Sequence, residues 1–515
     1  MKFRIAAVAV SLLALAGPAL AGPVPRAQVD AAIKEIETMA DDLIAAGAVP
    51  GFAIGVVHDD EVVWTKGFGV RRVGAPDPVD ADTVFQLASM SKPISSTVIA
   101  ALVGKGIVGW DDRIVEHDPG FALHDPYPTA EVTIRDMLDH RSGLPGSAGN
   151  DLETIGFDRD TIMHRLRLVP PWVSFRGGYS YSNAAFTEGG LAVAKAAGKD
   201  WETVAEEELF APLGMVSTSF RYSDFLDRKD AAALHVSWQG AWTPLVTRDA
   251  TAQAPAGGAS SSVNDMTRWM RMELASGDFG GVPVIPADAL APTRMPQSAR
   301  GKNPITGAES FYGIGWALEI GRHGTIWAHA GAFSNGALTV VKLAPESGLG
   351  IVILSNGFPN PAPDGIADSF LDFAVDGKLT QDYLEPWAAY YGRMFEPDIA
   401  AAKARFATPP DPANPALPAT AYAGRYHNAY VGDAVVEAGA EGALTLRLGP
   451  DGMERLPMTH FDRDTFTYFP DVEMPDRPSA IRFAIGDDGR AETVTLESLD
   501  ANGLGTLARA DQDLP

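Results

Sequence analysis

Three short segments of this chain carry residue types that suit covalent acyl transfer. Ser89-Met90-Ser91-Lys92 places a hydroxyl and an amine one helical turn apart. Tyr181-Ser182-Asn183 supplies a phenol and an amide, and His329-Ala330-Gly331 supplies an imidazole followed by small residues. A serine hydroxyl attacks a carbonyl only when a neighbour takes its proton, and either a partly desolvated lysine or a tyrosine ionised beside that lysine can do so. The three segments, in this order, indicate chemistry through an acyl-enzyme on Ser89.

The surroundings of the first segment favour this interpretation. Ser89 lies where a strand-like run, Val84 to Leu87, meets a helix whose buried face is marked by Ile94, Val98 and Leu102. The positive end of the helix dipole is expected at Ser89, with the amine of Lys92 within reach of the hydroxyl. Taken alone, Ser89 is better explained as a helix N-cap and Lys92 as a solvated charge.

The second and third segments would complete the site. We expect Tyr181 to act as a proton shuttle, and Asn183 to position Lys92 and bind a substrate carbonyl. His329 ends a predicted strand, and the small residues Ala330, Gly331 and Ala332 suit a substrate that lies along a strand edge. The backbone N–H groups of Ser89 and Ala332 could form an oxyanion hole. A core aromatic, a turn asparagine and an ordinary strand histidine are the alternatives.

Metal and cofactor chemistry has no support in the sequence. The chain has ten histidines without zincin-type spacing and no cysteine, which excludes disulfides, thiolate metal sites and a cysteine nucleophile. We therefore expect no metal and no cofactor.

Strand patterns at both ends of a helical middle predict an α+β fold. A helix is expected over 31–46 and a hairpin over 52–58 and 61–68. Further strands are expected over 315–320, 325–329, 337–343 and 349–354, and helices and loops between 90 and 295. This order predicts one antiparallel sheet flanked by helices, with a mostly helical subdomain inserted.

The character of the chain changes after Asn356. A helical pattern over 381–406 is followed by a proline-rich stretch, and period-two alternation begins at Tyr422, which predicts a small all-β barrel or sandwich. We divide the chain into a signal peptide (1–21), a hydrolase domain (22–378), a helical and proline-rich linker (379–419) and a β domain (420–515).

Composition limits the location and the partners. The 515 residues carry a formal net charge of -25, which makes nucleic acid an unexpected partner. Lys2 and Arg4, an apolar run from Ile5 to Ala16 and the small residues before Gly22 are typical of a secretory signal. We expect a periplasmic or secreted protein without a stable membrane anchor after cleavage. Its oligomeric state stays open.

The three segments together resemble the motifs of the penicillin-recognising serine hydrolases, which include D-alanyl-D-alanine carboxypeptidases, class C β-lactamases, D-aminopeptidases and β-lactamase-like esterases. The stretches 133–144 and 257–261, with Asp265, are also similar to that family. The resemblance covers about Ala31 to Asn356, and the segment after Tyr422 resembles an appended lipocalin-like domain.

The resemblance implies Ser89 as the acylated nucleophile, Lys92 and Tyr181 as the proton-transfer pair, and the Ser89 and Ala332 amides as oxyanion donors. Many β-lactamases carry lysine in the third motif, whereas His329 resembles the carboxypeptidase and D-aminopeptidase branches. A neutral imidazole attracts a substrate carboxylate less than an ammonium group does. The expected function is therefore a peptidase or esterase acting on a small molecule or peptide, with β-lactamase activity as an alternative.

Two further alternatives come from other classes. One is a non-catalytic binding or assembly protein on the same fold. The other is an α/β-hydrolase, whose nucleophile elbow is nearly matched around Ser334. Some of the tryptophans near the motifs could line an apolar acyl pocket, whereas core or rim packing is the simpler interpretation for most of them: Trp172, Trp238, Trp242, Trp316 and Trp327.

Overall fold

A single antiparallel sheet forms the centre of the larger part of the molecule. The computed structural model describes residues 22–238, 241–245, 247–471 and 473–510. The eight strands run in the order β2-β1-β14-β13-β12-β11-β10-β9, and all neighbours are antiparallel. Their bounds are β1 Gly51–His58, β2 Glu61–Gly69, β9 Ser298–Lys302, β10 Glu309–Tyr312, β11 Ala317–Gly321, β12 Gly324–Phe333, β13 Ala337–Ala344 and β14 Leu349–Ser355.

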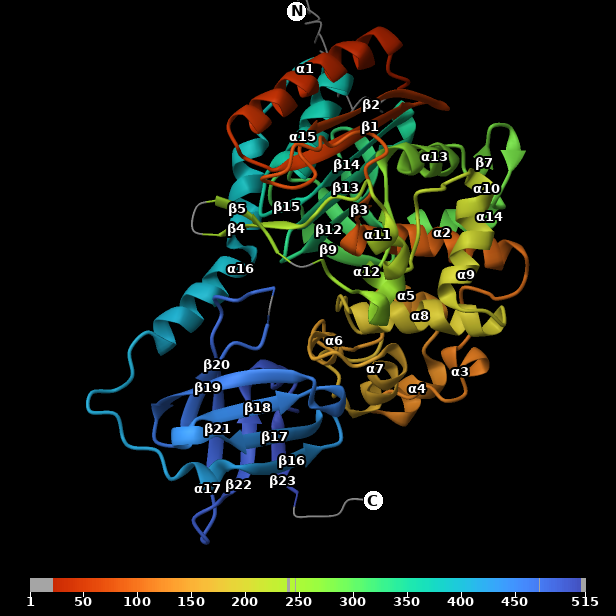
Figure 1. Cartoon of the computed structure of the whole chain (residues 1–515). Coiled ribbons are helices and arrows are strands. Elements are labelled where there is room, and N and C mark those ends of the chain that lie inside the picture. Colours follow the sequence, from red (N-terminus) through yellow and green to blue (C-terminus); the bar gives the residue numbers. More distant parts are fainter. Residues whose placement is uncertain (1–21, 239–240, 246, 472, 511–515) are drawn as a thin grey trace, which may run out of the picture.

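Helices cover both faces of this sheet (Figure 1). Strand β14 is buried along its whole length because its side chains alternate between two separate hydrophobic clusters. Ile351 and Ile353 pack with α1 (Arg26–Ala45) and α15 (Ala362–Leu371). Val352 and Leu354 face the other way, toward the cluster that contains α2 (Ser91–Gly104) and α13 (Val263–Leu274).

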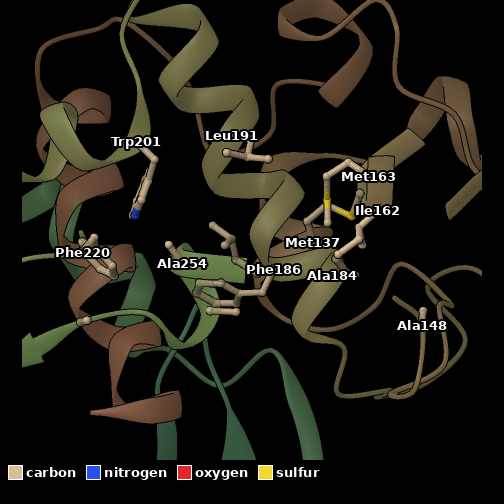
Figure 2. Packing of buried hydrophobic residues seen from close by; sticks show 14 of the residues in the cluster. Met137, Ala148, Ile162, Met163, Ala184, Phe186, Leu191, Trp201, Phe220 and Ala254 are labelled. Carbon is tan, nitrogen blue, oxygen red and sulfur yellow. The ribbon is translucent and has the colours of Figure 1, made fainter. Parts of the chain in front are cut away.

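A mostly helical subdomain lies beside the sheet and packs around α8 (Asn183–Ala196). Figure 2 shows Phe186 and Leu191 of this helix among Met137, Trp201 and Ala254 from neighbouring segments. Its other helices include α3 Ile114–His117, α4 Pro126–Glu131, α5 Ile134–Leu138, α6 Asn150–Thr154, α7 Arg159–Arg165, α9 Trp201–Ala205, α10 Ala211–Leu213, α11 Tyr222–Asp227, α12 Ala254–Gly257 and α14 Ala287–Leu290. Short strands outside the large sheet are β3 Phe85–Gln86, β4 His235–Trp238, β5 Ala241–Pro244, β6 Ser260–Ser261, β7 Asp278–Phe279, β8 Val282–Pro283 and β15 Gly357–Phe358.

The C-terminal part is a closed eight-stranded barrel. The long helix α16 (Leu384–Phe406) runs from the sheet toward it (Figure 1). A short helix, α17 (Ala419–Tyr422), precedes the barrel. The barrel strands are β16 Gly424–Asn428, β17 Gly432–Ala438, β18 Leu444–Leu448, β19 Glu454–Asp462, β20 Thr465–Tyr468, β21 Ser479–Ile485, β22 Ala491–Leu496 and β23 Thr506–Arg509.

A partly buried ionic contact joins the barrel to the larger part. Glu473, from the loop between β20 and β21, accepts hydrogen bonds from Arg248 Nη1 at 3.0 Å and from Ser334 Oγ at 2.9 Å. Arg248 also donates to Glu153 Oε2 at 2.6 Å. Since Ser334 follows β12 directly, this loop of the barrel contacts the sheet at the end of that strand.

The predicted fold class is confirmed, including the antiparallel sheet, the helical insertion and the lipocalin-like barrel. The α/β-hydrolase alternative is wrong, because the large sheet is antiparallel and the Ser334 hydroxyl is bound to Glu473. The predicted signal peptide, 1–21, lies outside the described residues. Among the residues that are described, no helix is both long and apolar enough to cross a membrane.

Candidate active site

The backbone around Ser89 makes a tight, strained turn between β3 and α2. Residues Ala88–Met90 form a 3-10 turn, and Ala88 adopts a left-handed conformation with φ of 50°, which is costly for a residue with a Cβ atom. The hydroxyl of Ser91 stabilises the turn, because it donates to Ala88 O at 2.7 Å and accepts from Ala259 N at 2.9 Å. The turn places Ser89 at the N-terminal end of α2, as the sequence predicts.

The amine of Lys92 is completely buried and has three oxygen neighbours. Its Nζ atom lies 3.1 Å from Ser89 Oγ, 2.7 Å from Asn183 Oδ1 and 2.9 Å from Ala256 O. Burial lowers the pKa of Lys92 well below its ordinary value, because no carboxylate among the described residues offsets the loss of solvation. The site therefore favours the neutral amine.

A neutral amine fits these three neighbours. It has two N–H groups and one lone pair, and the amide oxygen of Asn183 and the carbonyl of Ala256 can only accept. When both N–H groups donate to those oxygens, the lone pair is left for Ser89, whose O–H can then donate to it. Asn183 and Ala256 thus orient Lys92 as a base toward the serine.

The phenol of Tyr181 lies beside both Ser89 and Lys92. It is hydrogen-bonded to Ser89, and its ring centroid is 4.6 Å from Lys92 Nζ. Burial raises the pKa of Tyr181 above its ordinary value. Tyr181 is therefore a neutral phenol at rest, able to donate a proton near the serine, while Lys92 is the better base.

The loop that carries Tyr181 is fixed by caps at the start of α8. Ser182 Oγ accepts from Ala185 N, and the backbone N–H of Ser182 donates to His140 Nδ1 at 3.1 Å. The His140 ring also packs on Tyr181, with ring centroids 4.4 Å apart. Asn183 is the first residue of α8, and the contacts of Tyr181 and Ser182 with His140 hold the start of this helix in the site.

Strand β12 approaches the serine turn so closely that only glycine fits. A Cβ atom at Gly331 would lie 2.0 Å from Leu87 O and 2.8 Å from Met90 N. This contact places Ala330, Gly331 and Ala332 beside Ser89 in one cleft. The arrangement brings together the two backbone segments that were predicted to supply the oxyanion hole.

The same part of β12 has a free edge. β11 pairs with β12 only as far as Ala328, whereas β13 pairs with residues 327–333 on the other side. In the register of the described strands, the edge of 329–333 that faces away from β13 has no partner. An extended substrate could therefore pair with this edge next to Ser89.

His329 is buried with both ring nitrogens occupied. Nδ1 lies 2.7 Å from the carbonyl oxygen of Ala330, and Nε2 lies 3.0 Å from the hydroxyl of Tyr312. Burial is the largest cause that lowers the pKa of His329, to about 3. The imidazole is neutral at pH 7 with Nδ1 as donor and Nε2 as acceptor, an arrangement that favours positioning β12 over proton transfer.

The cleft has a volume of about 560 Å³ and extends beyond the motif residues. Arg300 of β9 lies over the rings of Tyr179 and Tyr312, at 5.6 Å and 5.8 Å from their centroids. On the other side of the β12 edge, the cleft is lined by α16 residues: Trp387, Tyr390, Tyr391 and Met394.

Sequence reasoning missed several of these residues. Tyr312 and Arg300 belong to no short motif and reach the site only through sheet packing, whereas His140 lies in the stretch 133–144 but has no predicted role. Trp172, which is 77% exposed, and Trp316, which is buried against Trp269, do not line the cleft, in line with the rim or core packing expected for most of these tryptophans. A different tryptophan, Trp387 of α16, lines the cleft.

Comparison with known proteins agrees with this geometry. A family model described as Beta-lactamase matches residues 36–375, more than half of the chain. The chain therefore belongs to the Beta-lactamase family. A second model, described as a domain of unknown function (DUF3471), matches residues 408–507 and so covers most of the barrel.

Individual relatives are distant but cover much of the chain. The unguisins hydrolase ungD of Aspergillus violaceofuscus is 25% identical over 517 residues, 91% of this chain and 90% of the relative. The D-alanyl-D-alanine-carboxypeptidase/endopeptidase AmpH of Escherichia coli K12 is 25% identical over 66% of this chain and 88% of its own length. The structure of an octameric penicillin-binding protein homologue from Pyrococcus abyssi shares the fold, with a TM-score of 0.57, 21% identity and coverage of 90% of this chain and 98% of that one.

Proposed function

We propose that this protein is an exported serine hydrolase that cleaves an amide or ester bond through an acyl-enzyme on Ser89. It acts as a peptidase, of carboxypeptidase or aminopeptidase type, or as an esterase. The observation that carries the proposal is the buried amine of Lys92, 3.1 Å from Ser89 Oγ and held by two further acceptors. Membership of the Beta-lactamase family and relatives named as hydrolases support it.

Acylation begins with proton transfer from Ser89 to the neutral Lys92. The Oγ atom forms a bond to the substrate carbonyl carbon, and the carbonyl oxygen takes the negative charge. The N–H groups of Ser89 and Ala332 would stabilise this oxyanion, with the positive end of the α2 dipole behind Ser89.

Collapse of the tetrahedral intermediate breaks the bond to the leaving group. Tyr181, hydrogen-bonded to Ser89, donates its proton to the leaving nitrogen or oxygen and regains one from the protonated Lys92. Water then attacks the acyl-enzyme, gives its proton to the same pair, and releases the acid as Ser89 regains its hydrogen. Asn183 keeps the amine in place in both halves of the reaction.

The third motif lowers the expectation of β-lactamase activity. The neutral His329 supplies no positive charge for a substrate carboxylate, unlike a lysine at that place. The non-catalytic alternative leaves the base, the phenol and the strained serine turn without a purpose. We therefore rank peptidase and esterase activity above both.

A substrate screen with three proteins tests the proposal. Wild type, Ser89→Ala and Lys92→Met are assayed on chromogenic esters, D- and L-aminoacyl anilides and peptides ending in D-alanine. We expect each variant to lose at least about 1,000-fold in kcat on every substrate that the wild type cleaves. Full activity of Ser89→Ala would contradict the proposal. Ser334→Ala serves as the control and should retain activity.

A further inference from the structure

The cleft crosses the free edge of β12, so it has two different sides. His329 and Gly331 face the serine turn, and Gly331 directly contacts Leu87 and Met90. Ala330 and Ala332 alternate with them and pack on the opposite face, Ala332 against a cluster that contains Trp387 and Tyr391 of α16. The far side of the cleft is therefore made by α16.

This side of the cleft is aromatic and partly open. Trp387 and Tyr391 are almost fully buried and stack at 5.6 Å, and Tyr390 packs edge-on against both at 5.3 Å. Tyr390 and Met394 keep 39% and 38% of their surface exposed, and both line the cleft that contains Ser89. We call Trp387, Tyr390, Tyr391 and Met394 the α16 wall.

A buried polar network fixes the α16 wall to the sheet. Tyr391 donates to Asp364 Oδ2 at 2.5 Å, and Trp387 Nε1 donates to Asp368 Oδ2 at 2.8 Å. Lys342 of β13, also buried, pairs with Asp368. The buried members of the wall are thus rigid, while the exposed faces of Tyr390 and Met394 have no such hydrogen-bonded role in the described structure.

We propose that the α16 wall is a specificity site that binds a large apolar side chain of the substrate next to the scissile bond. The inference rests on the proposed function and deepens it. In an extended substrate that pairs with the edge of 329–333, successive side chains point to opposite sides of the sheet. When the scissile carbonyl lies at Ser89, the neighbouring side chain points to Tyr390 and Met394.

Helix α16 lies between the two segments that the family models match. The Beta-lactamase model ends at residue 375 and the second model begins at 408, whereas α16 spans Leu384–Phe406. The wall thus lies outside both matched segments, although it lines the same cleft as Ser89. Aromatic rings and a methionine thioether suit a bulky aliphatic or aromatic group better than a charged one.

Two pairs of substrates test the site. p-Nitrophenyl octanoate and acetate differ on the acyl side, and naphthyl and phenyl acetate differ on the leaving-group side. The readout is the ratio of kcat/KM for the large and the small member, in which a general loss of activity cancels. We expect the wild type to prefer the large member of at least one pair, and Tyr390→Ala and Met394→Ala to lower that ratio by about tenfold.

A third variant and two controls sharpen the result. The larger side chain in Met394→Trp fills the part of the cleft beside the α16 wall and should also reduce the preference for the large member. Met453→Ala and Tyr127→Ala change side chains that are 65% and 68% exposed and do not line the cleft, so the ratio should not change. A wild type without size preference in either pair, or ratios in all three wall variants within twofold of wild type, would overturn the inference. Hydrolysis retained in Ser89→Ala would instead overturn the proposed function.

Discussion

The amine of Lys92 lies 2.7 Å from the amide oxygen of Asn183, and this contact joins two segments that are 91 positions apart in the chain. Lys92 is in the first turn of α2, and Asn183 begins α8. Because the amide accepts one N–H of the amine, the start of α8 decides where the lysine lone pair points. The first and second motifs therefore act as one unit.

Replacing Asn183 by aspartate should shift the pH dependence of activity. Protonated Lys92 cannot accept the serine proton, so kcat/KM rises with pH as the amine loses its proton and then reaches a plateau. In the wild type, the lowered pKa of Lys92 places this rise well below pH 10.5. The carboxylate of Asn183→Asp stabilises the ammonium form and should move the rise about one to three units upward. If the pH at which kcat/KM rises were unchanged or lower in Asn183→Asp, the result would contradict neutral Lys92 as the base.

A methyl group at Gly331 should separate β12 from the serine turn. The new Cβ atom of Gly331→Ala would lie 2.0 Å from Leu87 O and 2.6 Å from Thr339 Oγ1. Relief by backbone movement should cost about 1–3 kcal/mol in unfolding free energy, and the displaced oxyanion hole should lower kcat/KM about 100-fold. Urea unfolding and steady-state kinetics measure the two effects.

Gly392→Ala is the matched control for this substitution. Gly392 lies within α16 with open space at its Cβ position, and alanine favours a helix over glycine by about 1 kcal/mol. Stability and activity should be unchanged or slightly higher. Equal behaviour of the two alanine variants would show that β12 does not depend on the close contact at Gly331.

The two cleft tyrosines should differ when each loses its hydroxyl. Tyr181→Phe removes the proposed proton donor and should lower kcat at least about 100-fold. Tyr312→Phe removes the hydrogen bond to His329 Nε2 and leaves a buried acceptor unpaired, which should cost about 1–3 kcal/mol in stability. Its kcat should fall less than about tenfold. The reverse order in kcat would assign proton transfer to the His329–Tyr312 pair.

Glu473 should hold the barrel against the larger part of the molecule. Glu473→Ala leaves the partly buried Arg248 with Glu153 as its remaining carboxylate partner, and the loss of one hydrogen bond between charged groups costs about 1.5–3 kcal/mol. We expect faster proteolytic cleavage in the segment 407–418 between α16 and the barrel. Asp476→Asn removes an exposed ion pair with Lys403 and should have little effect. Equal cleavage rates of both variants would contradict this role.

The sequence predicted the elements that follow a local rule. Strands β1, β2, β13 and β14 lie within a residue or two of their predicted bounds, since buried β-branched runs between turn residues are a strong signal. The helix expected over 31–46 begins earlier, at Arg26, because Pro25 forms its N-terminal boundary. Ser89, Lys92, Tyr181 and Asn183 could be grouped because each lies within a short motif.

Residues that reach the cleft through packing could not be predicted in the same way. Tyr312 faces His329 only because β10 and β12 flank β11 in the sheet. The α16 wall depends on where a helix packs across the sheet, which neither its spacing nor its composition encodes. The electrostatic state of Lys92 likewise depends on complete burial and on a carbonyl from Ala256, a residue far along the chain.

Intact-protein mass after incubation with a fluorophosphonate and, separately, with a penicillin shows whether Ser89 forms an acyl-enzyme. Wild type and Ser89→Ala are compared, and the modified peptide is then mapped. We expect one fluorophosphonate adduct per chain, located on Ser89 and absent from Ser89→Ala. A lasting penicillin adduct at the same serine would show acylation without turnover. A folded wild type without any adduct, or an adduct that persists in Ser89→Ala, would contradict an acyl-enzyme on Ser89.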